Sequence, residues 1–217
     1  PPDVAEEVAD QVLAYSFTGL YLDANAISPQ RAMRIGQAMI EGGARFVDGG
    51  IIGGPAWKPG ETCLYLSGQD AHAAAACFSD GPLETSVIGE AIGKASALKM
   101  CFAAYTKGTT ALLCAILAAA EVLGVREELH CQWSRNESDF AEQAEQRVKR
   151  VTAKAWRFVG EMDEIAATFD EAGVPGNFHT AAAIIYRRIA HFKDAPSTPS
   201  LEDVLATLVR MDETKSC

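Results

Sequence analysis

The sequence predicts an α/β domain followed by an all-α domain, and two observations support this division. Before Ile92, short apolar segments that suit strands alternate with segments of helical periodicity. From Ile92 onward the pattern is helical, beginning with a long apolar helix that stops at Gly124. Strands separated by helices are typical of parallel βαβ units. We therefore expect part of an open parallel sheet in residues 1–91 and a helical domain in residues 92–217.

The individual elements follow from local signals. A helix is expected at residues 4–15, and a second one begins at Pro29, with Ser28 as its N-cap and a Gly42-Gly43 stop. Strands are expected at residues 19–23, 44–47, 62–66 and 83–88, with a glycine-rich loop at 49–60. Further helices are expected at residues 92–123, 126–135, 138–159, 161–172, 177–192 and 200–212.

Composition and charge exclude several classes of function. The formal net charge is −10, which disfavours binding to nucleic acid and to anionic membranes. The charge-free apolar stretch at 108–120 is too short to span a bilayer. None of the six cysteines forms a CxxC pair, which favours a reduced protein without a metal site. We expect a cytoplasmic protein that binds a small molecule.

The long helix carries the strongest candidate for chemistry. Between Ala95 and Ala120 its only charged residues are Lys99 and Lys107. A lysine on a buried helix is costly unless it faces a polar cavity, a partner or a substrate anion. Helical geometry aligns Lys99 with Thr106 and Thr110, while Lys107 lies to one side. Lys99 therefore either lines a cleft or extends its ammonium to the exposed edge of the helix.

Two segments that follow strands are candidates for ligand contact. The segment Asp48-Gly49-Gly50-Ile51-Ile52-Gly53-Gly54-Pro55 is rich in glycine, which lets a ligand approach the backbone closely. The segment Asp23-Ala24-Asn25-Ala26-Ile27-Ser28-Pro29 also follows a strand. Ligands of open α/β sheets bind at the carboxyl ends of strands, so both segments could contribute. A flexible turn remains the alternative for the glycine-rich segment.

These motifs together resemble the β-hydroxyacid dehydrogenases. Residues 23–29 resemble the family's post-strand motif, residues 46–54 its substrate loop, and residues 93–99 the start of the helix that presents its catalytic lysine. Residues 96–101 and 106–110 are typical of the 6-phosphogluconate-dehydrogenase-like branch with a distinctive C-terminal helical domain. The resemblance covers nearly the whole chain. It implies an incomplete Rossmann-type parallel sheet followed by a 6-phosphogluconate-dehydrogenase-like helical domain.

The resemblance also implies roles for individual residues. In this family a Rossmann domain holds NAD(P), a helical domain closes over the substrate, and members commonly pair through the helical domain. Lys99 would be the catalytic acid and base, and a homodimer is expected. Asn25 and Ser28 would lie near the nicotinamide. The implied substrate-binding residues are Ile52, Gly53, Gly54, Ala103, Thr106 and Lys107.

The sequence departs from the family pattern at three points. The GxGxxG fingerprint, its preceding strand and its following acidic residue are not found, which corresponds to roughly 70 residues, or about two βα units. Ile52 replaces the substrate-binding serine of many relatives, and Ala103 replaces an asparagine one turn after the lysine. The last two changes favour a less polar substrate than a simple hydroxy acid.

Three interpretations follow. The first is an NAD(P)-dependent dehydrogenase or reductase of a small hydroxy, carbonyl or imine substrate, which requires the N-terminal dinucleotide-binding segment. The second is a truncated enzyme without cofactor, an isomerase, lyase or cyclase that relies on Lys99. The third is an inactive dimerisation module. A sequence without the fingerprint favours the second interpretation, whereas a chain that does not begin with Met favours the first.

Overall fold

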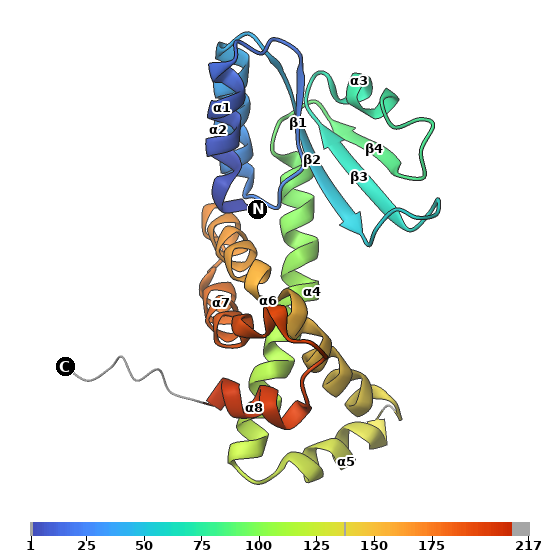
Figure 1. Cartoon of the computed structure of the whole chain (residues 1–217), viewed down its shortest axis with the longest axis vertical. Coiled ribbons are helices and arrows are strands. Elements are labelled where there is room, and N and C mark those ends of the chain that lie inside the picture. Colours follow the sequence, from blue (N-terminus) through green and yellow to red (C-terminus); the bar gives the residue numbers. More distant parts are fainter. Residues whose placement is uncertain (1, 137, 210–217) are drawn as a thin grey trace, which may run out of the picture. The chain divides into compact units, whose positions relative to one another are not determined.

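The computed structural model describes residues 2–136 and 138–209, in which the chain forms two compact units (Figure 1). Unit 1 extends to Ala104 and includes Glu164–Gly176, whereas unit 2 contains Tyr105–Asp163 and continues from Asn177. We expected a boundary at residue 92, where the long helix begins. The compact units divide inside that helix, after Ala104.

The four strands of unit 1 form one sheet in the order β1-β2-β3-β4. They are β1 (Leu20–Asp23), β2 (Arg45–Gly53), β3 (Thr62–Ser67) and β4 (Glu84–Gly89). The pairs β1–β2 and β3–β4 are parallel, as expected, but β2 and β3 are antiparallel. Only residues 54–61 join β2 to β3, and a connection this short can link antiparallel neighbours but not parallel ones. The sheet is therefore mostly parallel, with one antiparallel pair.

Strand β2 is longer than the expected strand at 44–47 and includes residues 49–53 of the expected glycine-rich loop at 49–60. Its register runs from Asp48 opposite Ser67 to Gly53 opposite Thr62. Glycine usually weakens a strand interior, which is why a loop was expected. Gly49 is required here because a Cβ atom would lie 2.9 Å from the Leu22 side chain and 3.0 Å from the Asp23 carbonyl oxygen. The prediction of a loop at residues 49–53 is thus wrong.

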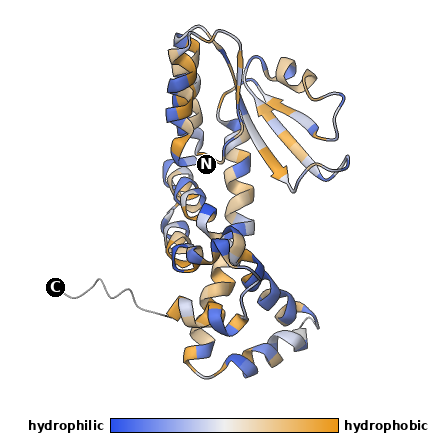
Figure 2. Ribbon diagram, viewed as in Figure 1, coloured by the Kyte–Doolittle hydropathy of each residue, from blue (hydrophilic) through white to orange (hydrophobic). Residues whose placement is uncertain are grey.

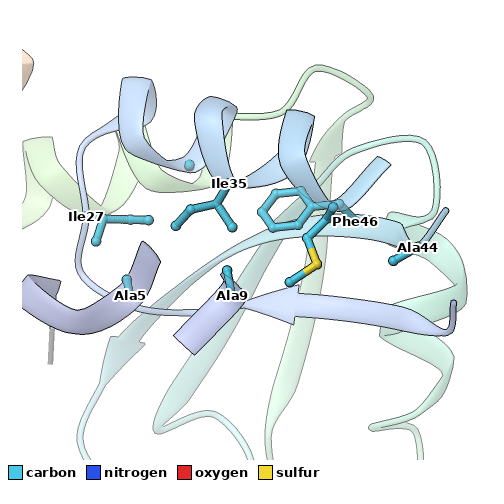
Figure 3. Close-up of a cluster of buried hydrophobic side chains, with 8 residues drawn as sticks. Ala5, Ala9, Ile27, Ile35, Ala44 and Phe46 are labelled. Atoms are coloured by element: carbon cyan, nitrogen blue, oxygen red, sulfur yellow. The ribbon is translucent and has the colours of Figure 1, made fainter. Parts of the chain in front are cut away.

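The helices of unit 1 are η1 (Pro2–Val4), α1 (Ala5–Ala14), α2 (Pro29–Glu41), α3 (Ala71–Ala76), the first turns of α4 (Lys94–Val122) and the last turns of α6 (Phe140–Glu171). Helices α1 and α2 form the larger core cluster of this unit together with Phe46 of β2. Figure 3 shows Ala9, Ile35 and Phe46 within this cluster, where α1 and α2 meet the sheet. Helix α3 was not predicted, since its six residues include only alanines and one histidine and lack a periodic apolar pattern.

The helices of unit 2 follow the expected order. They are the remainder of α4, α5 (Arg126–Asn136), most of α6 (Phe140–Glu171), α7 (Asn177–Ile189), η2 (Ala190–Asp194) and α8 (Leu201–Val209). The two helices expected at 138–159 and 161–172 are the single helix α6. An interior glycine such as Gly160 costs about 1 kcal/mol and does not by itself end a helix. The last residues of the helix expected at 200–212 lie outside the described residues.

Helix α4 is apolar over most of its length, as Figure 2 shows, but it is not buried on all sides. Leu98, Phe102, Tyr105 and Leu112 are exposed along it. Among the described helices it is also long and apolar enough to cross a membrane by length and composition alone, with half of that window buried against protein. The core helix of a soluble protein meets the same criterion.

A buried histidine in unit 2 predicts a stability change near neutral pH. His179 is buried on α7, and burial lowers its pKa below 6.5. At pH values between the lowered pKa and 6.5 the unfolded chain binds more protons than the folded one. The contribution of His179 to the free energy of unfolding is therefore complete above pH 6.5 and decreases as the pH falls below that value. We expect urea unfolding from about pH 7 to about pH 5 to show this loss, and His179→Gln to flatten it. His130→Gln, at an exposed position of unit 2, is the control; equal slopes in all three proteins would contradict the prediction.

Candidate functional site

The N-terminus of α4 is anchored to the sheet by a buried carboxylate. Asp48 lies in β2 and is 1% exposed. Its Oδ2 atom accepts hydrogen bonds from the backbone N–H groups of Gly93 (2.9 Å) and Ser96 (3.1 Å), and Oδ1 accepts one from Ser96 Oγ (2.6 Å). These N–H groups open the helix and have no partner within it. Asp48 therefore fixes the first turn of α4, and a negative charge is favourable at this end of a helix.

Ser67 completes this anchor from the neighbouring strand. It faces Asp48 in the antiparallel register, and its hydroxyl donates to Asp48 Oδ2 at 3.0 Å. The hydroxyl oxygen of Ser67 in turn accepts a hydrogen bond from the backbone N–H of Ala95 at 3.1 Å. The sequence did not predict that Asp48 and Ser67 anchor α4, although Asp48 is the first residue of the glycine-rich segment at 48–55. An aspartate within an apolar strand was the available signal, because such a group needs buried donors.

Lys99 lies one turn beyond this anchor, half-buried in unit 1. Its Nζ atom donates a hydrogen bond to the backbone carbonyl of Ile51, near the carboxyl end of β2. The helix reaches the strand here because of Gly50, where a Cβ atom would lie 2.7 Å from the Ala95 carbonyl oxygen and 3.2 Å from Lys99 Cβ. The glycine thus brings Lys99 to the edge of the sheet at which the parallel strands β1 and β2 finish.

Asn25 lies at the same edge, just after β1. Its backbone N–H donates to Asp23 Oδ1 at 2.8 Å, and its side-chain amide donates to both carboxylate oxygens at 3.1 Å. Burial raises the pKa of Asp23 despite these hydrogen bonds. Asp23 pairs with Asp48 in the parallel register. The residues that follow them, Asn25 in one segment and Gly49-Gly50 in the other, therefore run in the same direction beside each other. Asn25 and the Lys99 region therefore occupy neighbouring parts of unit 1.

Ser28 is the N-cap residue of α2, as expected, but its side chain makes no capping hydrogen bond. Its backbone N–H instead donates to Glu164 Oε2 at 2.7 Å, and Arg31 forms an ion pair with the same carboxylate. Glu164 belongs to the part of α6 that lies in unit 1. The segment after β1 is thus fixed at both ends, by Asp23 and by Glu164.

Three of the expected substrate-binding residues, Ile52, Gly53 and Gly54, directly follow Ile51, whose carbonyl group contacts Lys99. Ile52 pairs with Cys63 near the end of β2, and Gly53 follows in a left-handed conformation with φ +131°. The carbonyl oxygen of Gly54 accepts a hydrogen bond from Thr62 Oγ1 at 2.6 Å. Ala103, one turn beyond Lys99, is 1% exposed. These residues and Lys99 all belong to unit 1.

Thr106 and Lys107 belong to unit 2, where other groups bind them. The ammonium of Lys107 lies 2.6 Å from Glu161 Oε2 and 4.9 Å from the ring centroid of Phe158. The carbonyl oxygen of Lys107 accepts a hydrogen bond from Tyr186, whose pKa is raised by burial. The carbonyl oxygen of Thr106 accepts from Thr110 and Arg147. Within the described ranges, no group of three or more His, Cys, Asp or Glu residues could hold a metal ion.

The close approach at Gly50 can be tested directly. We expect Gly50→Ala to lower the free energy of unfolding by about 1–3 kcal/mol, because the added methyl group forces α4 away from β2. Gly54→Ala is the matched control, since no atom lies within 4 Å of a Cβ atom there. Urea denaturation of both variants measures the effect. Equal stability of the two variants would show that α4 does not depend on Gly50.

Comparison with known proteins identifies part of unit 2 as a recurrent domain. Residues 120–189 match the family described as Domain of unknown function (DUF1932), which forms the C-terminal domain of β-hydroxyacid dehydrogenase-like proteins. An uncharacterized 28.5 kDa protein in the 7S RNA 5′ region of Methanothermus fervidus is 37% identical over 112 residues. This match covers 51% of the present chain and 42% of that relative, so less than half of the relative's length is matched.

Three solved structures share the fold over most of the chain. The conserved protein MTH1747 of unknown function, described as structurally similar to 3-hydroxyacid dehydrogenases, is 30% identical, with 96% of this chain and 75% of that one covered and a TM-score of 0.66. A conserved hypothetical protein from Sinorhizobium meliloti is 23% identical (95% and 71% covered, TM-score 0.71). The 3-hydroxyisobutyrate dehydrogenase of Mycobacterium tuberculosis, solved with L-serine, is 17% identical (94% and 77% covered, TM-score 0.61).

These matches agree with the arrangement built above from single residues. A mostly parallel sheet precedes a helical region, and the domain match falls in that region, mostly in unit 2. The relative that is 30% identical is matched over three quarters of its length. The chain therefore belongs to the β-hydroxyacid dehydrogenase-like proteins, with a partial Rossmann sheet and the DUF1932 type of C-terminal domain.

Proposed function

We propose that the chain works as an NAD(P)-dependent dehydrogenase or reductase of a small hydroxy, carbonyl or imine substrate, with Lys99 as the acid and base. One observation carries the proposal: Lys99 is held near the carboxyl end of β2 by the Ile51 carbonyl. Ligands of open α/β sheets bind beyond the carboxyl ends of parallel strands, and β1 and β2 are such a parallel pair. The dehydrogenase-like scaffold is consistent with this chemistry.

The proton chemistry follows from the contacts of Lys99. A charged lysine has three N–H donors, and the Ile51 carbonyl engages one of them. In reduction, Lys99 would donate a proton to the substrate oxygen or imine nitrogen. In oxidation, the neutral amine would remove the proton from the hydroxyl group. Anchoring of the helix start by Asp48 would keep the ammonium in place during both steps.

The residues at the sheet edge fit the nicotinamide end of a dinucleotide. Asn25, tied to Asp23, would lie beside the ring, and Ser28 would close the same segment. When bound, NAD(P) supplies or accepts the hydride. The groups for its pyrophosphate would come from a glycine-rich fingerprint, which the 217 residues do not contain.

The residues around Lys99 favour a substrate with an apolar portion. Ile52 and Ala103 offer no hydrogen-bonding side chains, and at Gly54 no atom lies within 4 Å of a Cβ position. In this proposal Lys107 has a structural role, because its ammonium is paired with Glu161. A carbonyl or imine carrying an alkyl or aryl group would suit these residues better than a small polyhydroxy acid.

The first test is a calorimetric titration of NADH and NADPH into the protein carrying the N-terminal dinucleotide-binding segment that the proposal requires, followed by a screen of carbonyl and imine substrates. We expect a Kd in the micromolar range, about −8 kcal/mol of binding free energy, for one of the two cofactors. No binding at about 1 mM would contradict the proposal. Turnover without cofactor would then favour the isomerase, lyase or cyclase interpretation, and no turnover at all would favour the inactive dimerisation module.

We further propose that the protein is a homodimer that pairs through α4. In unit 2, Tyr105, Leu112 and Ala119 are exposed on this helix, and Thr109 and Ile116 between them are half-buried. Their alternating spacing of four and three residues is that of a coiled-coil seam. A second copy would cover this apolar face, whereas a monomer would leave it in water.

Sedimentation equilibrium would test the dimer with two matched variants. Leu112→Arg should yield monomers, because it introduces a charge into the apolar seam. Ile184→Arg on α7 changes a residue of the same type of exposure, 44% against 45%, away from the seam, and should leave the dimer intact. A monomeric wild type would contradict the proposal.

The five cysteines among the described residues are free, which would suit a reducing compartment such as the cytoplasm.

A further inference from the structure

A cavity of about 700 Å³ lies wholly within unit 2, lined by α4 and by the first half of α6. This volume lies within the usual range of small-molecule sites, about 300–1,000 Å³. None of the residues at the sheet edge contributes to its lining. Its lining has an apolar part, formed by Leu113, Phe140, Ala144 and Val151, and a polar part that contains all of its charged residues. The cavity is therefore separate from the Lys99 site.

Arg147 provides a fixed cation in this cavity. Its Nε atom donates to Thr110 Oγ1, and its Nη2 atom donates to Thr109 Oγ1 and to the Thr106 carbonyl oxygen, each at 2.6 Å. All three acceptors are neutral. In the part of the chain that the structure describes, no carboxylate forms an ion pair with Arg147, and its Nη1 group makes no hydrogen bond to protein. The guanidinium is thus oriented in advance and keeps donors for an anion.

Two further cations lie on the same side of α6. Arg150 and Lys154 follow Arg147 at i+3 and i+7, positions that share one helix face, and both line the cavity and are exposed. Glu142 is the acidic residue among the lining residues. The cavity therefore has an excess of positive charge in a chain whose formal net charge is −10. A local field opposite to that of the whole chain favours a specific anion.

We propose that this cavity binds a small carboxylate with an apolar body. The carboxylate would contact Arg147, Arg150 and Lys154, and the apolar body would cover Phe140, Leu113 and Val151. A planar carboxylate matches the fork of an arginine. A bare inorganic anion would leave the apolar lining in water. The site goes beyond the proposed dehydrogenase reaction, because it shares no residue with the Lys99 site.

Calorimetry with three probes would test the chemistry of the ligand. Phenylacetate carries both required features, phenylacetamide has the same shape without charge, and inorganic phosphate has charge without an apolar body. We expect phenylacetate to bind with a Kd at or below about 1 mM and the other two at least about tenfold more weakly. No binding of phenylacetate at about 10 mM, or equal affinity for phenylacetamide or phosphate, would overturn the proposal.

Two variants would locate the binding site. Arg150→Gln combined with Lys154→Gln removes two exposed charges of the cavity, and we expect the Kd for phenylacetate to rise about tenfold or more. Arg157→Gln removes an exposed charge of α6 outside the cavity and should leave the Kd unchanged. An unchanged Kd in the double variant, or an equal loss in Arg157→Gln, would overturn the assignment. So would a change of oligomeric state in the double variant without any effect on phenylacetate, which would make this surface a contact between copies.

Discussion

Replacing Lys99 with glutamine is expected to lower kcat/KM for any substrate of this protein by about 10²–10⁴-fold, the range for loss of a catalytic acid or base. Glutamine keeps a polar side chain with N–H donors at this half-buried position, so the fold loses little. It cannot exchange a proton with the substrate. The measurement is steady-state kinetics of wild type and variant, together with their urea denaturation midpoints.

Two control variants separate proton transfer from charge and from helix stability. Lys94→Gln changes an exposed lysine in the first turn of the same helix and should retain wild-type turnover. Lys99→Arg keeps the positive charge but does not release its proton near neutral pH, so it should fail as Lys99→Gln does. Turnover at the wild-type rate in Lys99→Gln would refute the assignment of Lys99, both for the redox reaction and for a reaction without cofactor.

Removing the cation of the buried pair in unit 2 is expected to destabilise the fold by about 3–5 kcal/mol. Lys107→Met would leave the carboxylate of Glu161, 7% exposed, without its partner at 2.6 Å. It would also remove the cation above Phe158. Breaking one side of a buried pair costs more than the pair itself contributes, because the remaining charge stays out of water. Urea denaturation measures the loss.

The double variant Lys107→Met/Glu161→Gln is expected to recover much of that stability, since no uncompensated charge remains. Arg34→Met is the reference for an exposed pair, because Arg34 and Glu6 are 61% and 43% exposed and such pairs contribute about 0–1 kcal/mol. Should Lys107→Met be as stable as Arg34→Met, the pair would have no structural role. Lys107 would then return as a candidate for substrate binding.

Much of the fold could be predicted because each local signal agreed with its neighbours. The strands at Leu20–Asp23 and Thr62–Ser67 and the helix from Pro29 appear within one or two residues of the expected positions. The antiparallel pairing of β2 with β3 could not be read from the alternation of elements, since it depends on a direct connection through residues 54–61. Helix α3 escaped prediction because its burial depends on alanines, whose pattern carries little periodicity.

The candidate site was predicted only in part, for a related reason. Lys99 was recognisable as an isolated charge on an apolar helix. Asp48, Ser67 and Gly50 were not assigned roles because these depend on the approach of α4 to a strand about 45 residues earlier in the chain. Sequence spacing carries no signal for such a contact. Gly50, which permits this contact, resembles a loop glycine in the sequence until the position of α4 beside it is known.

The anchoring of α4 has a consequence for how such an enzyme can change its substrate in evolution or in the laboratory. The support of Lys99 comes from Asp48, Ser67 and Gly50, whereas substrate preference would depend on Ile52 and Ala103. These are different side chains, so mutations at the second group need not disturb the first. If Lys99 has the proposed role, substitution of Ile52 by serine would therefore explore new substrates while the anchor of Lys99 stays in place. This separation makes the scaffold evolvable.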